Sequence, residues 1–126
     1  MSSVIPQTDY TTEQLDKFYN SNPTVFHDEG FGSTDSSIKY FESLKGMLGQ
    51  IIEINVSGNR HFTFELQCSA GFVILSGCNC GYSGTGPHGT IQILQLLGFK
   101  DYKKYEEQIF GENEVRIDCR EKGCFW

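Results

Sequence analysis

The spacing of hydrophobic positions changes along the chain, and each change predicts a different element. Thr11 and Gln14 form a capping box ahead of a short helix that ends before Pro23. Residues 21–37 are rich in Gly, Ser, Thr and Asp and predict a loop. Apolar residues then recur at three and four positions over 38–48, which predicts a helix closed by Gly49.

After Gly49 the apolar residues alternate with polar ones. Residues 52–56 and 62–66 flank a turn at 57–59, which predicts an antiparallel hairpin with one face in water. Residues 72–75 are apolar throughout and predict a strand in the centre of the sheet. Residues 115–119 alternate again and predict a last short strand.

Two further helices are predicted in the second half of the chain. Residues 90–97 have helical spacing and stop at Gly98, and Asp101 can cap a helix that ends at Gly111. Together the elements predict an α+β protein with a mostly antiparallel sheet of about four strands and helices packed on one face. The length of 126 residues, with 38% hydrophobic residues, fits a single domain over residues 1–126.

Charge and cysteine content exclude several classes of partner. Ten basic and 16 acidic residues give a net charge of −6, which opposes binding to a nucleic acid polymer or an anionic membrane. The sequence has no apolar stretch that could cross a bilayer and no export signal at its start, so we expect a cytoplasmic protein. Five cysteines cannot all pair within one chain, and we expect reduced thiols.

The segment from 77 to 90 carries the candidate chemistry, and it reads Gly-Cys-Asn-Cys-Gly-Tyr-Ser-Gly-Thr-Gly-Pro-His-Gly-Thr. Glycine allows close approach of the backbone, and Pro87 is tolerated in the first turn of a helix. The unpaired N–H groups of that turn and the helix dipole favour an anion. We therefore predict a site for a small phosphate-bearing molecule. The candidate contacts are Gly81, Tyr82, Ser83, Gly84, Thr85, Gly86, His88, Gly89 and Thr90.

This segment is neither a Walker A sequence, which needs Gly-Lys-Ser or Gly-Lys-Thr, nor the dinucleotide fingerprint at its usual spacing. ATP hydrolysis and hydride transfer are therefore disfavoured. The alternative is that the glycines only shape a tight connection between strand and helix. Arg60 and Arg116, in or beside predicted strands, could pair with a phosphate or could be solvated surface residues.

Residues 81–87, Gly-Tyr-Ser-Gly-Thr-Gly-Pro, are followed by a helix rich in Ile and Leu. This arrangement resembles a Gly-Tyr-x-Gly-x-Gly-Pro signature of small proteins from bacteria and their phages. Size, acidity and the predicted anion site are also similar to phage anti-defence proteins that sequester nucleotide immune signals. The resemblance implies a cytoplasmic location in a bacterial host cell.

The cysteines allow two other chemistries. Four of them could bind zinc if the sheet brought them together: Cys78, Cys80, Cys119 and Cys124. Cys78 or Cys80 could instead act as a nucleophile with His88 or His61 as base. Small buried apolar cysteines are the alternative to both, and we expect no cofactor.

These observations favour a non-enzymatic module that sequesters a phosphate-bearing ligand, and we expect this ligand to be a nucleotide. Phe125 and Trp126 are expected to dock on the core or on a second subunit, which would suit a homodimer or a higher homo-oligomer. The alternative is an acidic, immunity or antitoxin-like protein that binds a basic protein partner through acids such as Asp28-Glu29 and Glu106-Glu107. An enzyme of cysteine or phosphodiester chemistry remains open.

Overall fold

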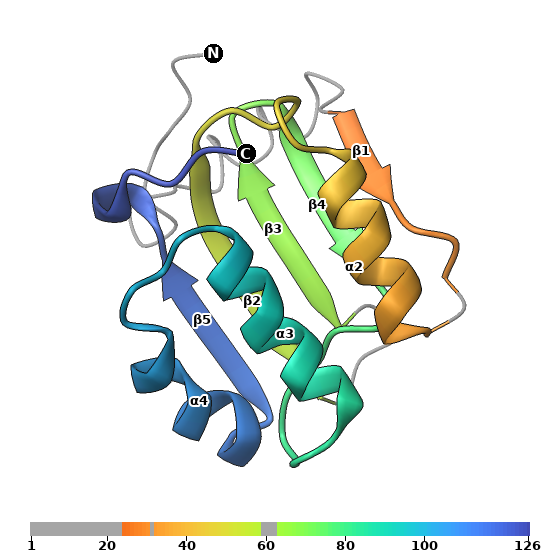
Figure 1. Cartoon of the computed structure of the whole chain (residues 1–126), viewed down its shortest axis with the longest axis vertical. Coiled ribbons are helices and arrows are strands. Elements are labelled where there is room, and N and C mark those ends of the chain that lie inside the picture. The colour runs from red at the N-terminus through yellow and green to blue at the C-terminus, as the bar shows by residue number, and fades with distance from the viewer. Residues whose placement is uncertain (1–23, 31, 59–62) are drawn as a thin grey trace, which may run out of the picture.

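The computed structural model describes residues 24–30, 32–58 and 63–126 (Figure 1). Arg60, His61 and the helix expected after Thr11 lie outside these residues. The described residues form five strands, three α-helices and one short 3₁₀ helix. They are β1 (Thr24–His27), α2 (Thr34–Ser43), β2 (Ile51–Ser57), β3 (Phe64–Cys68), β4 (Gly71–Leu75), α3 (Thr85–Leu96), α4 (Tyr102–Gly111), β5 (Glu114–Asp118) and the 3₁₀ helix Arg120–Lys122.

The strands form one mixed sheet in the order β1-β4-β3-β2-β5. All neighbours are antiparallel except β1 and β4, which are parallel. The α+β class and the mostly antiparallel sheet are confirmed, but the expected four strands become five. β4, which was expected inside the sheet, is confirmed there because it pairs with β1 on one side and β3 on the other, and β3 is the middle strand of the five.

β1 was expected to be part of a loop. It has only four residues, three of them exposed, and it pairs with β4 from Thr24 opposite Gly71 to His27 opposite Ile74. Such a short edge strand lacks the alternation that local patterns detect. Its pairing partner lies far along the chain, so only the tertiary structure reveals it.

The hairpin of β2 and β3 is confirmed, with Ile54 opposite Leu66 on the face that packs against the core. Its other face is not simply wet as expected, because Glu53 is only 2% exposed. Arg116 of β5 donates to Glu53 at 2.7 Å, and Asn55 donates to the same carboxylate at 2.8 Å. The buried charge is therefore paired, as burial requires.

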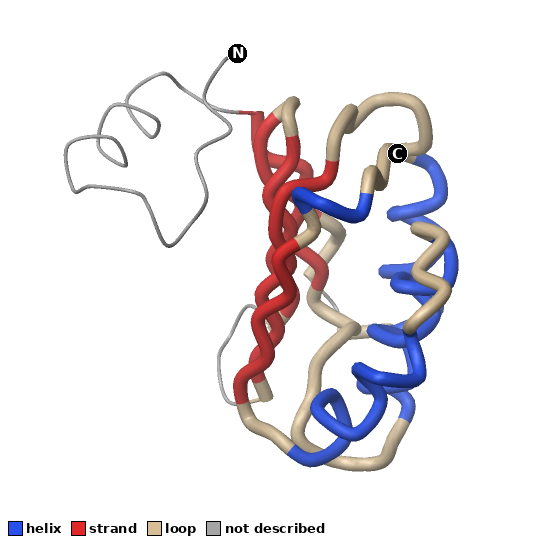
Figure 2. The backbone as a smooth tube through the Cα atoms, turned by 90° about the vertical axis from the view of Figure 1, so that its left-hand side faces the viewer, coloured by secondary structure: helices blue, strands red, loops and turns tan. Residues whose placement is uncertain are grey.

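The three described helices lie on one side of the sheet, as expected, and form a second layer (Figure 2). α2 begins after Ser33, whose side chain accepts from the Ser36 amide, and ends at Ser43, six residues before the expected Gly49. α3 begins at Thr85, five residues earlier than predicted, while its end next to Gly98 is confirmed. None of the described helices has both the length and the apolar character needed to cross a membrane.

The last residues dock on the core. The Trp126 ring stacks on Phe41 with 4.9 Å between the ring centroids, and its Nε1 donates to the Phe41 carbonyl at 2.8 Å. Phe125, by contrast, is 66% exposed. Of the two docking partners considered for this segment, the core therefore accounts for Trp126.

A buried carboxylate joins three parts of the fold. Asp28, directly after β1, accepts from the Ser37 hydroxyl of α2 at 2.5 Å and from the Ser76 amide after β4 at 2.9 Å. The Gly30 amide donates to its other oxygen at 3.0 Å. Asp28 is 8% exposed, so the expectation that it offers a surface charge to a basic partner is wrong.

Candidate functional site

The glycine-rich segment, residues 77–90, connects the end of β4 to the first turn of α3. Hydrogen bonds within the segment and to α4 fix its shape. The Gly81 amide donates to the Ile109 carbonyl of α4 at 2.8 Å, and the Asn79 amide donates to the Gly86 carbonyl at 3.3 Å. The Thr90 hydroxyl donates to the Asn79 carbonyl at 2.7 Å. The segment is therefore held in one shape by its own chain.

Packing explains the glycines of this segment except Gly84, where the nearest atoms belong to the exposed Tyr82 ring. An added Cβ at Gly86 would lie 2.1 Å from Asn79 Oδ1, and one at Gly89 would lie 2.4 Å from Thr34 Cγ2 at the start of α2. Five glycines have a neighbouring atom nearer than 3.0 Å to that position: Gly77, Gly81, Gly84, Gly86 and Gly89. The structure thus supports the alternative, a tight connection, as the reason for the glycines themselves.

The candidate contacts divide into three groups, of which Gly81 and Gly84 form the half-buried one. Exposed ones surround the start of α3: Tyr82, Ser83, Thr85 and His88. Gly86, Gly89 and Thr90 are buried. The prediction that the Thr90 side chain contacts a ligand is wrong, because its hydroxyl faces the interior and donates to backbone carbonyls.

The first turn of α3 is uncapped by side chains. Gly84 is the N-cap residue, with an extended backbone and no side-chain cap. The first intrahelical bond runs from the His88 amide to the Gly84 carbonyl at 3.1 Å. The amides of Thr85 and Gly86 precede it and so have no partner inside the helix. The His88 ring is anchored by Nδ1, 2.7 Å from the Gly84 carbonyl, and by Phe110, 4.9 Å between centroids.

Asn79 carries an unused acceptor beneath this turn. Its Nδ2 donates to the Tyr82 hydroxyl at 3.3 Å, whereas its Oδ1 is buried and has no hydrogen-bond partner among the described residues. A buried acceptor without a partner destabilises the fold by about 1–3 kcal/mol.

The charges next to the segment are acidic. Burial, followed by the carboxylates of Glu114 and Glu112, raises the pKa of Cys80 to about 11. Burial and Asp28 raise the pKa of Cys78 to about 12. Both thiols are therefore protonated at neutral pH, which removes the thiolate that a cysteine nucleophile requires.

The candidate arginine that the structure describes lies elsewhere. Arg116 alternates with the buried Val115 and Ile117, so it lies on the sheet face opposite the helices, where it pairs with Glu53. The prediction that Arg116 balances a phosphate at the segment is wrong for this reason. Arg120 pairs with Asp118 at the far end of β5. Arg60 lies outside the described residues.

The zinc alternative also fails on geometry. Cys80 lies near Glu114, where β5 begins, whereas Cys119 follows Asp118, where β5 ends. Five strand residues at about 3.3 Å each keep the two cysteine pairs roughly 15 Å apart. Among the described residues there is no group of three or more His, Cys, Asp or Glu side chains that could hold a metal ion.

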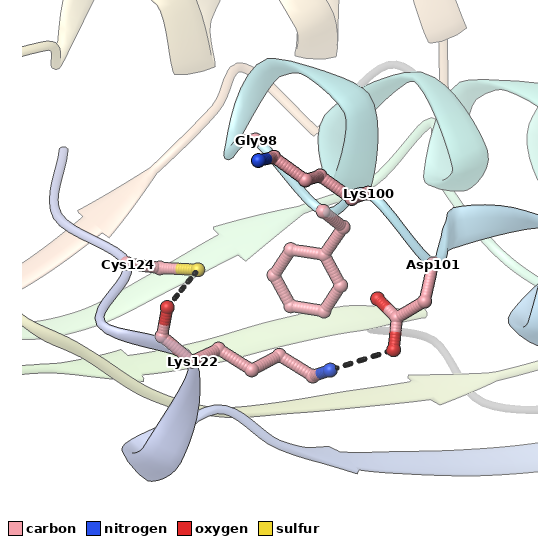
Figure 3. A pocket seen from close by; sticks show the side chains of 6 residues that line it. Gly98, Lys100, Asp101, Lys122 and Cys124 are labelled. Atoms are coloured by element: carbon pink, nitrogen blue, oxygen red, sulfur yellow. Dashed lines mark hydrogen bonds and ion pairs between the residues drawn. The ribbon is translucent and has the colours of Figure 1, made fainter.

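A second feature of the structure has no counterpart among the sequence predictions. A cavity of about 290 Å³ lies beside the connection between α3 and α4, which we call the α3–α4 cleft (Figure 3). It is lined by Gly98, Phe99, Lys100, Asp101, Lys122 and Cys124. The local signal was the lysine-rich stretch at 100–104, but Lys122 joins it only through the fold.

No protein-family model matches the chain, and comparison with curated proteins and with solved structures likewise finds no match. The resemblance at residues 81–87 therefore stays a prediction. The functional argument depends on the geometry of the chain itself.

Proposed function

We propose that the protein is a non-enzymatic binding module that holds a small phosphate-bearing molecule at the first turn of α3. The observation that carries the proposal is the uncapped start of this helix. The amides of Thr85 and Gly86 have no intrahelical partner, and the N-cap residue Gly84 has no side chain to accept from them. The positive end of the helix dipole favours an anion there.

The exposed side chains around the turn support a nucleotide as the ligand. Ser83 and Thr85 offer hydroxyl donors beside the amides. The Tyr82 ring lies against Gly84 and is 50% exposed, so a base can stack on it. Glu112 and Glu114 oppose a polyanion. We therefore expect a monophosphate to bind more tightly than a triphosphate.

The high pKa values of Cys78 and Cys80 support binding without turnover. A ligand that is held intact is sequestered, and sequestration of a nucleotide immune signal would be an anti-defence activity in a phage protein. Incubation of the protein with a nucleotide, followed by denaturation and mass analysis, should return the nucleotide unchanged. Recovery of a cleaved product would indicate an enzyme instead.

A pair of substitutions at Thr85 tests the proposed site at the first turn of α3, which we call the helix-turn site. Thr85→Pro removes the backbone amide of the first helical residue, the N1 position. The substitution is compatible with the helix, because proline is favoured at N1 and Gly84 already has the extended backbone that proline requires of the residue before it. Thr85→Ala removes the same hydroxyl and keeps the amide. A hydrogen bond to a charged group is worth about 1.5–3 kcal/mol, so we expect Thr85→Pro to bind adenosine monophosphate about 10 to 100 times more weakly than Thr85→Ala.

Calorimetry provides the measurement, and thermal denaturation verifies that both variants fold. Adenosine, which lacks the phosphate, serves as the control ligand and should bind far more weakly than adenosine monophosphate. Equal binding of the monophosphate by the two variants would show that the N1 amide does not contact the ligand.

A further inference from the structure

The α3–α4 cleft lies between two rigid segments. On one side, α3 ends in a turn in which Gly98 has φ +84° and the Phe99 amide donates to the Leu94 carbonyl at 3.0 Å. This C-terminal cap directs the Phe99 ring into the core. On the other side, the Cys124 carbonyl accepts from the Ile51 amide of β2 at 2.9 Å. Both walls are therefore fixed before any ligand arrives.

Lys122 is held in place at the edge of the cleft. Its Nζ donates to Asp101 Oδ2 at 2.9 Å and lies over the rings of Phe99 and Tyr105, at 5.0 and 5.3 Å from their centroids. An ammonium group has three donors, of which Asp101 accepts one and the Tyr105 hydroxyl a second, so one is left for a ligand. The side chain is thus preorganised, which lowers the entropic cost of binding.

Lys100 provides the second charge. In Figure 3, the Lys100 side chain extends toward Gly98, whereas the Lys122 side chain extends toward Asp101. Among the residues that the structure describes, Lys100 is exposed and makes no ion pair. Two lysines, Lys100 and Lys122, and one acid, Asp101, line the cleft. This local excess contrasts with the net charge of −6 on the chain.

We propose that the α3–α4 cleft is a second binding site, separate from the glycine-rich segment, which takes a small oxyanion of the phosphate type at the Lys122 ammonium group, with Lys100 as the second cation that lines the cleft. A cavity of about 290 Å³ is at the lower limit of ligand pockets, so it suits a single phosphate group or a small phosphate monoester. Asp101 keeps Lys122 oriented and also reduces the net positive charge of the site.

The probes are inorganic phosphate and methyl phosphate, titrated separately into the full chain and followed by amide NMR shifts. We expect saturable shifts at residues 98–101 and 122–124. Tighter binding of inorganic phosphate would identify the free ion as the ligand, and tighter binding of methyl phosphate would identify a phosphate monoester. Absence of saturable shifts in the cleft with both probes would overturn the proposal.

Matched lysine variants test the two charges. Lys100→Gln and Lys122→Gln should each weaken binding about tenfold or more, because each removes a charge-assisted contact. Lys39→Gln removes an exposed lysine from α2 and should leave the affinity unchanged. An equal loss in the Lys39 variant would indicate an effect of net charge alone and would overturn the proposal.

The outcome is separable from that of the proposed function. Thr85→Pro should leave phosphate binding in the cleft intact. If the phosphate shifts instead appear at residues 82–88 and disappear in Thr85→Pro but not in Lys100→Gln, the cleft proposal is wrong while the helix-turn site stands.

Discussion

Single residues in the glycine-rich segment are explained by their immediate neighbours. Gly89 lies in the first two turns of α3, directly against Thr34 of α2, and a side chain would occupy the same space as the Thr34 methyl group. Thr34 in turn donates from its hydroxyl to the Gly77 carbonyl at 2.6 Å. The close contact of α2 with the segment therefore depends on the absence of a side chain at residue 89.

A double substitution tests this contact. Gly89→Ala should destabilise the protein by about 1–3 kcal/mol through overpacking, reduced by the better helix propensity of alanine. Thr34→Ser removes the methyl group that lies 2.4 Å from the added Cβ and keeps the hydroxyl, so it should restore much of the lost stability in the double variant. Denaturant unfolding measures the free energies.

Gly111→Ala is the matched control, because nothing lies within 4 Å of its added Cβ at the end of α4. It should change stability little or increase it by up to about 1 kcal/mol. Failure of Thr34→Ser to improve the Gly89→Ala variant would mean that the methyl contact is not the cause of the destabilisation.

At the scale of elements, Trp126 packs on α2, and residues 125 and 126 pair with the turn that follows it. The Trp126 amide donates to the Gly49 carbonyl at 3.0 Å, and its carbonyl accepts from the Leu48 amide at 2.9 Å. An isolated bridge between Phe125 and Gln50 continues this pairing. The segment thus closes the core at the end of the sheet where β2 begins.

Three substitutions separate the contributions of these two residues to stability. Trp126→Phe keeps an aromatic ring over Phe41 but loses the bond from Nε1, and should reduce the free energy of unfolding by about 1 kcal/mol. Trp126→Ala should reduce it by about 3–5 kcal/mol. Phe125→Ala, at the exposed neighbour, should change it by no more than about 0.5 kcal/mol.

Chemical denaturation of the three variants gives these values. Similar losses for Phe125→Ala and Trp126→Ala would contradict the assignment of the docking to Trp126.

At the scale of the whole molecule, Asp28 connects the parallel strand pair with the helical layer. Burial acts to raise the pKa of its carboxyl, but the bonds from Ser37, Ser76 and Gly30 outweigh it and lower the pKa below 3.8. A lowered pKa in the folded state means that the ionised form stabilises the fold at pH values above 3.8. This contribution is lost as the pH falls through the folded pKa.

Acid unfolding of Asp28→Asn tests this linkage. At neutral pH the variant should be less stable by about 2–4 kcal/mol, because it weakens several bonds to a buried charge. The difference from the natural sequence should stay constant down to about pH 5 and shrink below about pH 4. Urea unfolding at a series of pH values measures it.

Glu107→Gln, at an exposed position on α4, provides the control and should leave the difference from the natural sequence small at every pH. A constant deficit of Asp28→Asn down to pH 2 would contradict the assigned role of the carboxylate.

The sequence by itself determined the elements whose patterns are local. Alternation over 52–56 and 62–66 defined the β2–β3 hairpin, and Gly98 and Gly111 marked the ends of α3 and α4, because propensity and periodicity act over a few residues. The sequence also located the segment that starts α3, but it did not determine which side chains of that segment face water.

Only the tertiary structure decided the remaining features. β1 depends on a distant parallel partner, Arg116 is directed away from the segment by the strand alternation of β5, and Lys122 reaches Asp101 across the fold. The glycines of the segment look identical in sequence whether they contact a ligand or the chain itself. Contacts between residues far apart in sequence depend on three-dimensional packing, and local sequence patterns carry no information about it.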